Sequence, residues 1–188
     1  PENTKVSVQA AIDLGLNWVE VDVQPTKDNV LVVCHDHTIN RCSNGQGRVD
    51  ELNLEELKAL DFGSWFSADF SGEKIMTLDE LLTLATEHKL NLNIEVKVDR
   101  HPAEEVAQAL ANVLAKSPMP QEKVLLSSFS HDVIRALHKY CNEYRLGVLS
   151  EFLTRKDKRL LEEVNAYSCN LNINWVRSRQ INKLQQAG

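Results

Sequence analysis

The segment Trp18-Val-Glu-Val-Asp-Val-Gln24 decides the fold, because its apolar and acidic side chains alternate strictly. A β-strand sends successive side chains to opposite faces, so the three valines share one face and Glu20 and Asp22 share the other. Carboxylates on the inner face of a sheet are costly unless a cation compensates them. The segment therefore indicates a strand that carries a metal site at the mouth of a barrel.

Two further apolar segments carry reactive side chains. Asn91-Leu-Asn-Ile-Glu-Val-Lys97 repeats the alternation, and it places Glu95 and Lys97 on the face opposite its three apolar residues. Val30-Leu-Val-Val-Cys-His-Asp36 is predicted to be a buried strand that ends at His35. Barrel enzymes place catalytic residues at the C-terminal ends of their strands. His35 is therefore a candidate catalytic residue.

Helix and strand patterns alternate along the remaining chain, which favours a mostly parallel sheet with helical crossovers. Thr4 to Leu14 is predicted as a helix ended by Gly15, and we expect Glu2 and Asn3 to cap its start. Further strands are predicted at Val124–Phe129, Leu146–Leu149 and Ser168–Trp175, and further helices after Thr77, after Ser130, near Leu160–Val164 and at Gln180–Ala187. The polar connection at about residues 41–75 is expected to be a small insertion that covers the site.

Composition limits the class of protein. With 188 residues, 43% of them hydrophobic, the chain is predicted to form a single domain over residues 1–188. The net charge of -6 argues against nucleic-acid binding. No run approaches the roughly 18 apolar residues of a membrane span, so no stable membrane association is expected. The four cysteines lack C-x-x-C spacing, which favours reduced thiols and a cytoplasmic location.

Several motifs occur together along the chain. They are Pro1-Glu-Asn-Thr4, Val19-Glu-Val-Asp22, Cys34-His-Asp36 with Arg41-Cys-Ser-Asn-Gly45, Gly63-Ser-Trp-Phe66, Ile94-Glu-Val-Lys97 and Ser127-Ser-Phe129. In this order and spacing the chain resembles the glycerophosphodiester phosphodiesterase family, in its short bacterial cytoplasmic type. The resemblance implies an α/β fold, the TIM (β/α)8 barrel of phospholipase C-like phosphodiesterases. Such a barrel needs about 200 residues or more. We therefore expect the chain to hold the middle six βα units, without the first and last strands.

The resemblance also assigns the site. Glu20, Asp22 and Glu95 would bind a divalent metal ion, and three hard oxygen ligands suit Mg²⁺, more than Ca²⁺. His35 would donate a proton, and Lys97 would neutralise the phosphate of the substrate. The implied reaction is metal-dependent hydrolysis of a small glycerophosphodiester to glycerol 3-phosphate and an alcohol. A partner histidine, in a His-Arg-Gly motif, would lie upstream of Pro1, so these 188 residues alone are expected to be inactive.

Simpler interpretations of the same residues stay open. The three carboxylates could pair with lysine and arginine on exposed strands, His35 could cap a strand through a backbone bond, and Lys97 could only pair with a neighbouring carboxylate. Two other functions also stay open. One is a non-catalytic binding module derived from a barrel. The other is a related phospholipase that acts on intact lipid, which would need an apolar lip or a basic loop.

Overall fold

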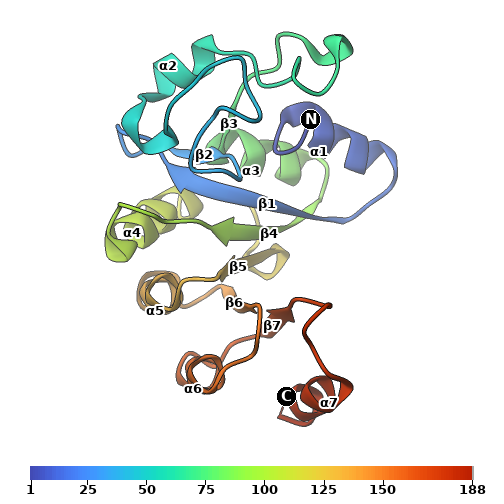
Figure 1. Ribbon diagram of the computed structural model, residues 1–188, viewed down its shortest axis with the longest axis vertical. Helices are drawn as coiled ribbons and strands as arrows, with labels where there is room; N and C mark the ends of the chain where they lie inside the picture. Colours follow the sequence, from blue (N-terminus) through green and yellow to red (C-terminus); the bar gives the residue numbers. More distant parts are fainter. Residues whose placement is uncertain (188) are drawn as a thin grey trace.

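One seven-stranded sheet organises the molecule, in the order β3-β2-β1-β4-β5-β6-β7 (Figure 1). The structure is a computed structural model, and it describes residues 1–187. The parallel strands are β1 (Trp18–Pro25), β4 (Asn91–Val96), β5 (Val124–Ser128), β6 (Arg145–Ser150) and β7 (Ser168–Leu171). Across residues 1–187 the sheet has two edges, β3 and β7, and does not close. The predicted mostly parallel sheet is confirmed.

In the described part of the chain, six longer helices precede, connect or follow the parallel strands. They are α1 (Lys5–Asp13), α3 (Leu78–Glu87), α4 (Ala103–Leu114), α5 (His131–Tyr140), α6 (Arg155–Glu163) and α7 (Ser178–Ala187). Figure 1 shows α4, α5 and α6 along the same side of the strands. Thr77 and Ser130 cap α3 and α5 through their side chains, as predicted. The predicted capping of α1 by Glu2 and Asn3 is wrong, because Thr4 is the residue that accepts from the Ser7 N–H.

The strand that leads to His35 runs in the opposite direction to the parallel strands. β2 (Leu31–Val33) is antiparallel to β1, and the short β3 (Met76–Thr77) is antiparallel to β2. A parallel pair needs a crossover of about a dozen residues, and the turn between Pro25 and Leu31 is far too short for one. The expectation of six parallel βα units is therefore wrong: residues 1–187 form the five parallel strands and this antiparallel extension.

The insertion after His35 has its own small core. It contains the 3-10 helix η1 (Val49–Glu51), helix α2 (Leu54–Ala59) and the 3-10 helix η2 (Ala68–Phe70); a further 3-10 helix, η3 (Gln121–Lys123), precedes β5. Its buried side chains pack on one another and on β2: Val32, Cys34, Ile39, Val49, Leu57, Phe62 and Ile75. Figure 1 shows α2 and the loops around it above β1 and β2. The insertion is thus an apolar cluster separate from the main core.

The two faces of the sheet differ in character. The alternate residues of β1 and β4, such as Val21 and Ile94, are buried in the main core with the apolar faces of the helices. The opposite face is polar: the register aligns Asp22 with Glu95, and Glu95 with Ser127. The alternation read from the sequence therefore separates a hydrocarbon core from a layer of polar side chains.

Two findings bear on the environment of the chain. No helix within residues 1–187 is long and apolar enough to cross a membrane. The cysteines Cys34, Cys42, Cys141 and Cys169 are all free thiols, as their spacing predicted.

Candidate active site and metal centre

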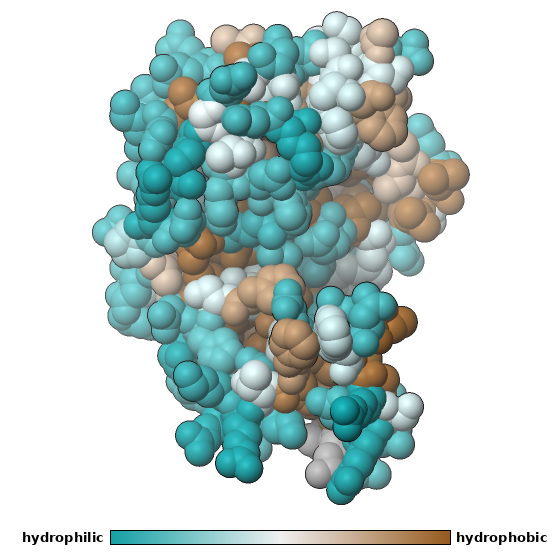
Figure 2. Space-filling view, in the orientation of Figure 1, coloured by the Kyte–Doolittle hydropathy of each residue, from teal (hydrophilic) through white to brown (hydrophobic). Residues whose placement is uncertain are grey.

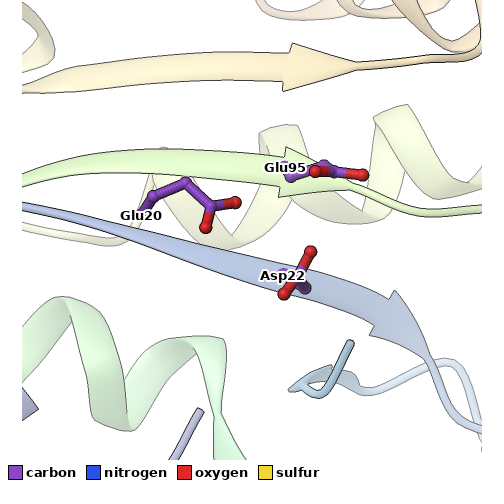
Figure 3. Close-up of side chains that lie close together, drawn as sticks. All are labelled: Glu20, Asp22 and Glu95. Carbon is purple, nitrogen blue, oxygen red and sulfur yellow. The ribbon is translucent and has the colours of Figure 1, made fainter. Parts of the chain in front are cut away.

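Three carboxylates meet on the polar face of β1 and β4 (Figure 3). Parallel pairing aligns Asp22 with Glu95, and Glu20 lies two residues earlier on the same face of β1. One carboxylate oxygen from each residue lies within 4.8 Å of the other two. Asp22 is buried, Glu95 is half-buried and Glu20 is exposed. The structure thus brings together all three residues predicted as metal ligands.

The charges of this group are incompletely compensated. Although Glu20 is exposed, the surrounding protein removes part of the hydration of its carboxylate, and this desolvation, together with the negative charges of Asp22 and Glu95, raises its pKa to about 7; Lys97 and His35 act in the opposite direction. A carboxyl group that holds its proton near neutral pH indicates a shortage of positive charge around it. Three oxygen ligands that converge at such a point fit a hard divalent cation.

Lys97 lies against the same carboxylates. Its Nζ is 2.8 Å from Glu95 Oε1 and 3.2 Å from Asp22 Oδ1. Burial lowers the pKa of Lys97, but the hydrogen bond to Glu95 and the charges of Asp22 and Glu95 outweigh this, and the net pKa is raised. The ammonium is therefore a fixed positive charge at the site, and the pairing with Glu95 that the sequence left open does occur.

Asn3 is a neighbour of the site that the sequence assigned to helix capping. Its Nδ2 donates to Asp22 Oδ2 over 2.9 Å, and its Oδ1 accepts from the Asp22 N–H over 3.3 Å. Its backbone has φ 55, a left-handed conformation that asparagine tolerates better than most residues. A cavity of about 320 Å³ lies beside it, lined in part by Glu2, Asn3, Glu20 and Asp22. Asn3 thus orients the most buried carboxylate of the group.

His35 reaches this site because β2 runs back along β1. The Cys34 N–H donates to the Asp22 carbonyl over 2.9 Å, so the next residue, His35, emerges beside the metal-ligand candidates. The His35 side chain is 53% exposed, and its Nδ1 lies 2.7 Å from Asp36 Oδ1. A parallel barrel strand was the expected carrier of His35. The observed carrier is the returning strand of a hairpin.

Arg41 joins Asp36 to the N-terminal segment. Its guanidinium donates to both carboxylate oxygens of Asp36 and to both of Glu2, with distances from 2.7 to 2.9 Å. Hydrogen bonds from Arg41 hold the pKa of Asp36 well below its usual range. Sequence reasoning placed Asp36 and Arg41 in motifs without assigning them roles. The contact of Arg41 with Glu2 spans 39 residues of chain, so no local sequence pattern could predict it.

The chain is similar in sequence to known phosphodiesterases. A sequence profile described as "Glycerophosphoryl diester phosphodiesterase family" matches residues 1–188. A glycerophosphodiester phosphodiesterase of Caldanaerobacter subterraneus subsp. tengcongensis is 35% identical over 170 residues, which cover 89% of this chain and 69% of that protein. One of Bacillus altitudinis is 32% identical over 178 residues, which cover 92% of this chain and 71% of that protein.

A solved structure agrees in fold. A phosphodiesterase of Oleispira antarctica, in complex with the product sn-glycerol-3-phosphate, superposes with a TM-score of 0.95 at 29% identity. The match covers 100% of this chain and 76% of that one. The predicted TIM-barrel type of fold is therefore confirmed, with the barrel open across residues 1–187.

Proposed function

The chain belongs to the glycerophosphoryl diester phosphodiesterase family, and on that premise we propose that it hydrolyses glycerophosphodiesters to glycerol 3-phosphate and an alcohol with the help of a divalent metal ion. One observation carries the proposal: Glu20, Asp22 and Glu95 converge, and Lys97 and His35 lie beside them. The product bound to the Oleispira antarctica phosphodiesterase supports a small-molecule substrate of this class.

The three carboxylates would hold the metal ion. Mg²⁺ is the better candidate, because it commonly uses a few carboxylates and completes its shell with water and substrate phosphate, whereas Ca²⁺ takes six to eight oxygen ligands. When bound, such an ion would act as a Lewis acid toward the phosphoryl group. Asn3, through its bonds to Asp22, would keep that carboxylate in place.

The remaining residues act on charge and on protons. Lys97, near the carboxylates, would also offset the negative charge of the phosphate, which is spread over its oxygens in the transition state. His35 would donate a proton to the leaving alkoxide oxygen, since an imidazole is partly protonated near neutral pH. Its exposure leaves the ring open to a substrate.

The test is the release of glycerol 3-phosphate from glycerophosphocholine by His35→Ala, in a protein in which these residues are joined to the His-Arg-Gly motif that the family resemblance implies. We expect turnover to fall by about two to four orders of magnitude while the circular dichroism spectrum is unchanged. His138→Ala is the matched control, because His138 is an exposed histidine on α5. Turnover of His35→Ala near that of wild type would remove His35 from the mechanism. Binding of glycerol 3-phosphate by the wild type without any turnover would favour a non-catalytic binding module.

The chain organisation and location form part of the proposal. We propose a single domain over residues 1–188 in which about 41–75 is an insertion, supported by the small apolar cluster of that segment. We also propose a cytoplasmic location, supported by the four free thiols. A thermal unfolding curve with two separate transitions would contradict the single domain.

A related phospholipase activity on intact lipid is the second candidate, because large apolar side chains are exposed. Phe66 is 61% exposed in the insertion, and Phe152, Ile173 and Trp175 are 57%, 84% and 58% exposed after β6 and β7. Figure 2 shows apolar surface in the middle of the face in view, at the height of β5 to β7 in Figure 1. Faster turnover on lysophospholipid vesicles than on glycerophosphocholine would favour this candidate.

A further inference from the structure

We propose that Asp36, held by Arg41 and Glu2, is a positioning residue that fixes the orientation and the tautomer of His35. The inference rests on the proposed function, in which His35 donates a proton. It adds to that function three residues that act through the histidine without contact with the substrate.

The contact between Asp36 and His35 determines which ring nitrogen carries the proton. Asp36 Oδ1 lies 2.7 Å from His35 Nδ1. An ionised carboxylate can only accept hydrogen bonds, so Nδ1 must be the donor in this pair. Proton exchange with a substrate is then left to Nε2, the other ring nitrogen. An ionised Asp36 also stabilises the imidazolium from which the proton is donated.

His35 depends on this contact because packing does not hold its ring. Its side chain is 53% exposed, and within residues 1–187 the bond to Asp36 is the only hydrogen bond of the ring. An exposed side chain with one partner would otherwise change rotamer freely. The orientation of His35 is therefore as well defined as the orientation of Asp36.

Arg41 fixes the orientation of Asp36 through two hydrogen bonds. Its Nε donates to Asp36 Oδ2 over 2.8 Å, and its Nη2 donates to Asp36 Oδ1 over 2.9 Å. The same guanidinium donates to Glu2 through Nη1 over 2.8 Å and through Nη2 over 2.7 Å. Two bidentate contacts on one planar group fix its position and plane. Lysine could supply the charge but not this geometry.

The Glu2–Arg41–Asp36 network orients side chains and contributes little to the stability of the fold. Arg41 and Glu2 are 46% and 40% exposed, and ion pairs between exposed side chains contribute little to stability because solvent screens them. It does connect the N-terminal segment, which carries Asn3 against Asp22, to the segment that carries His35. The network thereby fixes the position of His35 relative to the metal-ligand candidates.

A double-mutant cycle tests the proposal. We expect Asp36→Asn to lower kcat by about 10²-fold or more with a much smaller change in KM, as loss of acid catalysis would. Arg41→Lys should lower kcat by about tenfold, within the range for residues that orient another. If Asp36 acts only through His35, then Asp36→Asn in the His35→Ala background should cause no further loss. A further loss of tenfold or more would overturn the proposal.

Asp50→Asn is the matched control. Asp50 accepts from Arg48 Nε and Nη2 over 2.8 Å each, the same two-point contact that Arg41 makes with Asp36. Asp50 has no bond to His35. Loss of an equivalent ion pair there should leave kcat within twofold of wild type. An equal loss in both variants would show that Asp36 has only a general structural role.

Nitrogen NMR of the His35 ring separates this proposal from the proposed function. With histidine labelled at its ring nitrogens, neutral His35 should carry its proton on Nδ1, and Asp36→Ala should shift the population toward Nε2–H. This spectrum needs no turnover, so it decides the role of Asp36 even where His35→Ala shows that the hydrolase mechanism is wrong. Wild-type His35 with its proton on Nε2, or a tautomer unaffected by Asp36→Ala, would overturn the proposal.

Discussion

The pKa of Glu20 allows a quantitative prediction for metal binding. In the metal-free protein this pKa is about 7, because of partial desolvation of the carboxylate and the charges of Asp22 and Glu95. A metal ion needs the ionised carboxylate, so a proton competes with the metal below pH 7. Glu20 is about one-tenth ionised at pH 6 and about nine-tenths ionised at pH 8. Apparent affinity for Mg²⁺ should therefore rise about tenfold from pH 6 to pH 8, or about 1.4 kcal/mol, and level off above pH 8.

Isothermal titration calorimetry measures both the affinity and the proton. Titrations at pH 7 in buffers of different ionisation enthalpy should show release of about half a proton per Mg²⁺ bound. Glu20→Gln should bind Mg²⁺ more weakly, release no proton, and lose the pH dependence. His35→Gln should keep the tenfold rise, which excludes the histidine as its source. An affinity of the wild type that is flat from pH 6 to pH 8, or a slope retained in Glu20→Gln, would refute the reasoning.

Three further predictions concern stability and charge. Because the pKa of Glu20 is raised on folding, its ionisation destabilises the metal-free fold as pH rises from about 4.5 to 7. Glu20→Gln should therefore raise the melting temperature at pH 8 and leave it unchanged at pH 4. Lys97→Gln removes the cation that competes with Mg²⁺ for Asp22 and Glu95. Mg²⁺ should therefore bind about tenfold more tightly, while KM for the diester rises. An unchanged Kd for Mg²⁺ would contradict this competition. In Gly147→Ala the new Cβ would lie 2.9 Å from Ser168 Oγ and 3.3 Å from Ser127 Cβ. Chemical denaturation should show a loss of about 1 kcal/mol, partly restored by Ser168→Ala, and a neutral effect would show that the Ser168 hydroxyl rotates away from the new methyl group.

Period-two alternation predicted the metal-ligand candidates correctly as neighbours. In β1 and β4 it places Glu20, Asp22 and Glu95 on one face, and parallel pairing of adjacent strands then brings them within 4.8 Å. The same rule placed Lys97 beside Glu95. Which side chains share a face depends only on strand geometry, so the sequence contains that information, but the pairing of β1 with β4, which are not consecutive strands, is decided by the tertiary structure.

The route of the chain to His35 could be read only in part. The turn between Pro25 and Leu31 is too short for a parallel crossover, and this was visible in the sequence. The apolar run of residues 30–34 is equally typical of a parallel barrel strand, so its composition does not reveal the strand's direction. The predicted direction of the strand before His35 was therefore wrong, and the catalytic role of His35 stays a prediction.

The sequence by itself determined the alternating strands, the caps of α3 and α5, and the shared faces of Glu20 with Asp22 and of Glu95 with Lys97, because these follow from local periodicity and backbone chemistry. Only the tertiary structure decided that Glu2 and Asn3 meet Arg41 and Asp22, contacts that span 39 and 19 residues of chain. Only the tertiary structure also decided that Asp36, held by Arg41, contacts the ring of His35. Long-range contacts between polar side chains leave no periodic pattern, since each depends on how distant segments pack. The hydrogen bonds among Glu2, Arg41, Asp36 and His35 therefore become visible only in the folded chain.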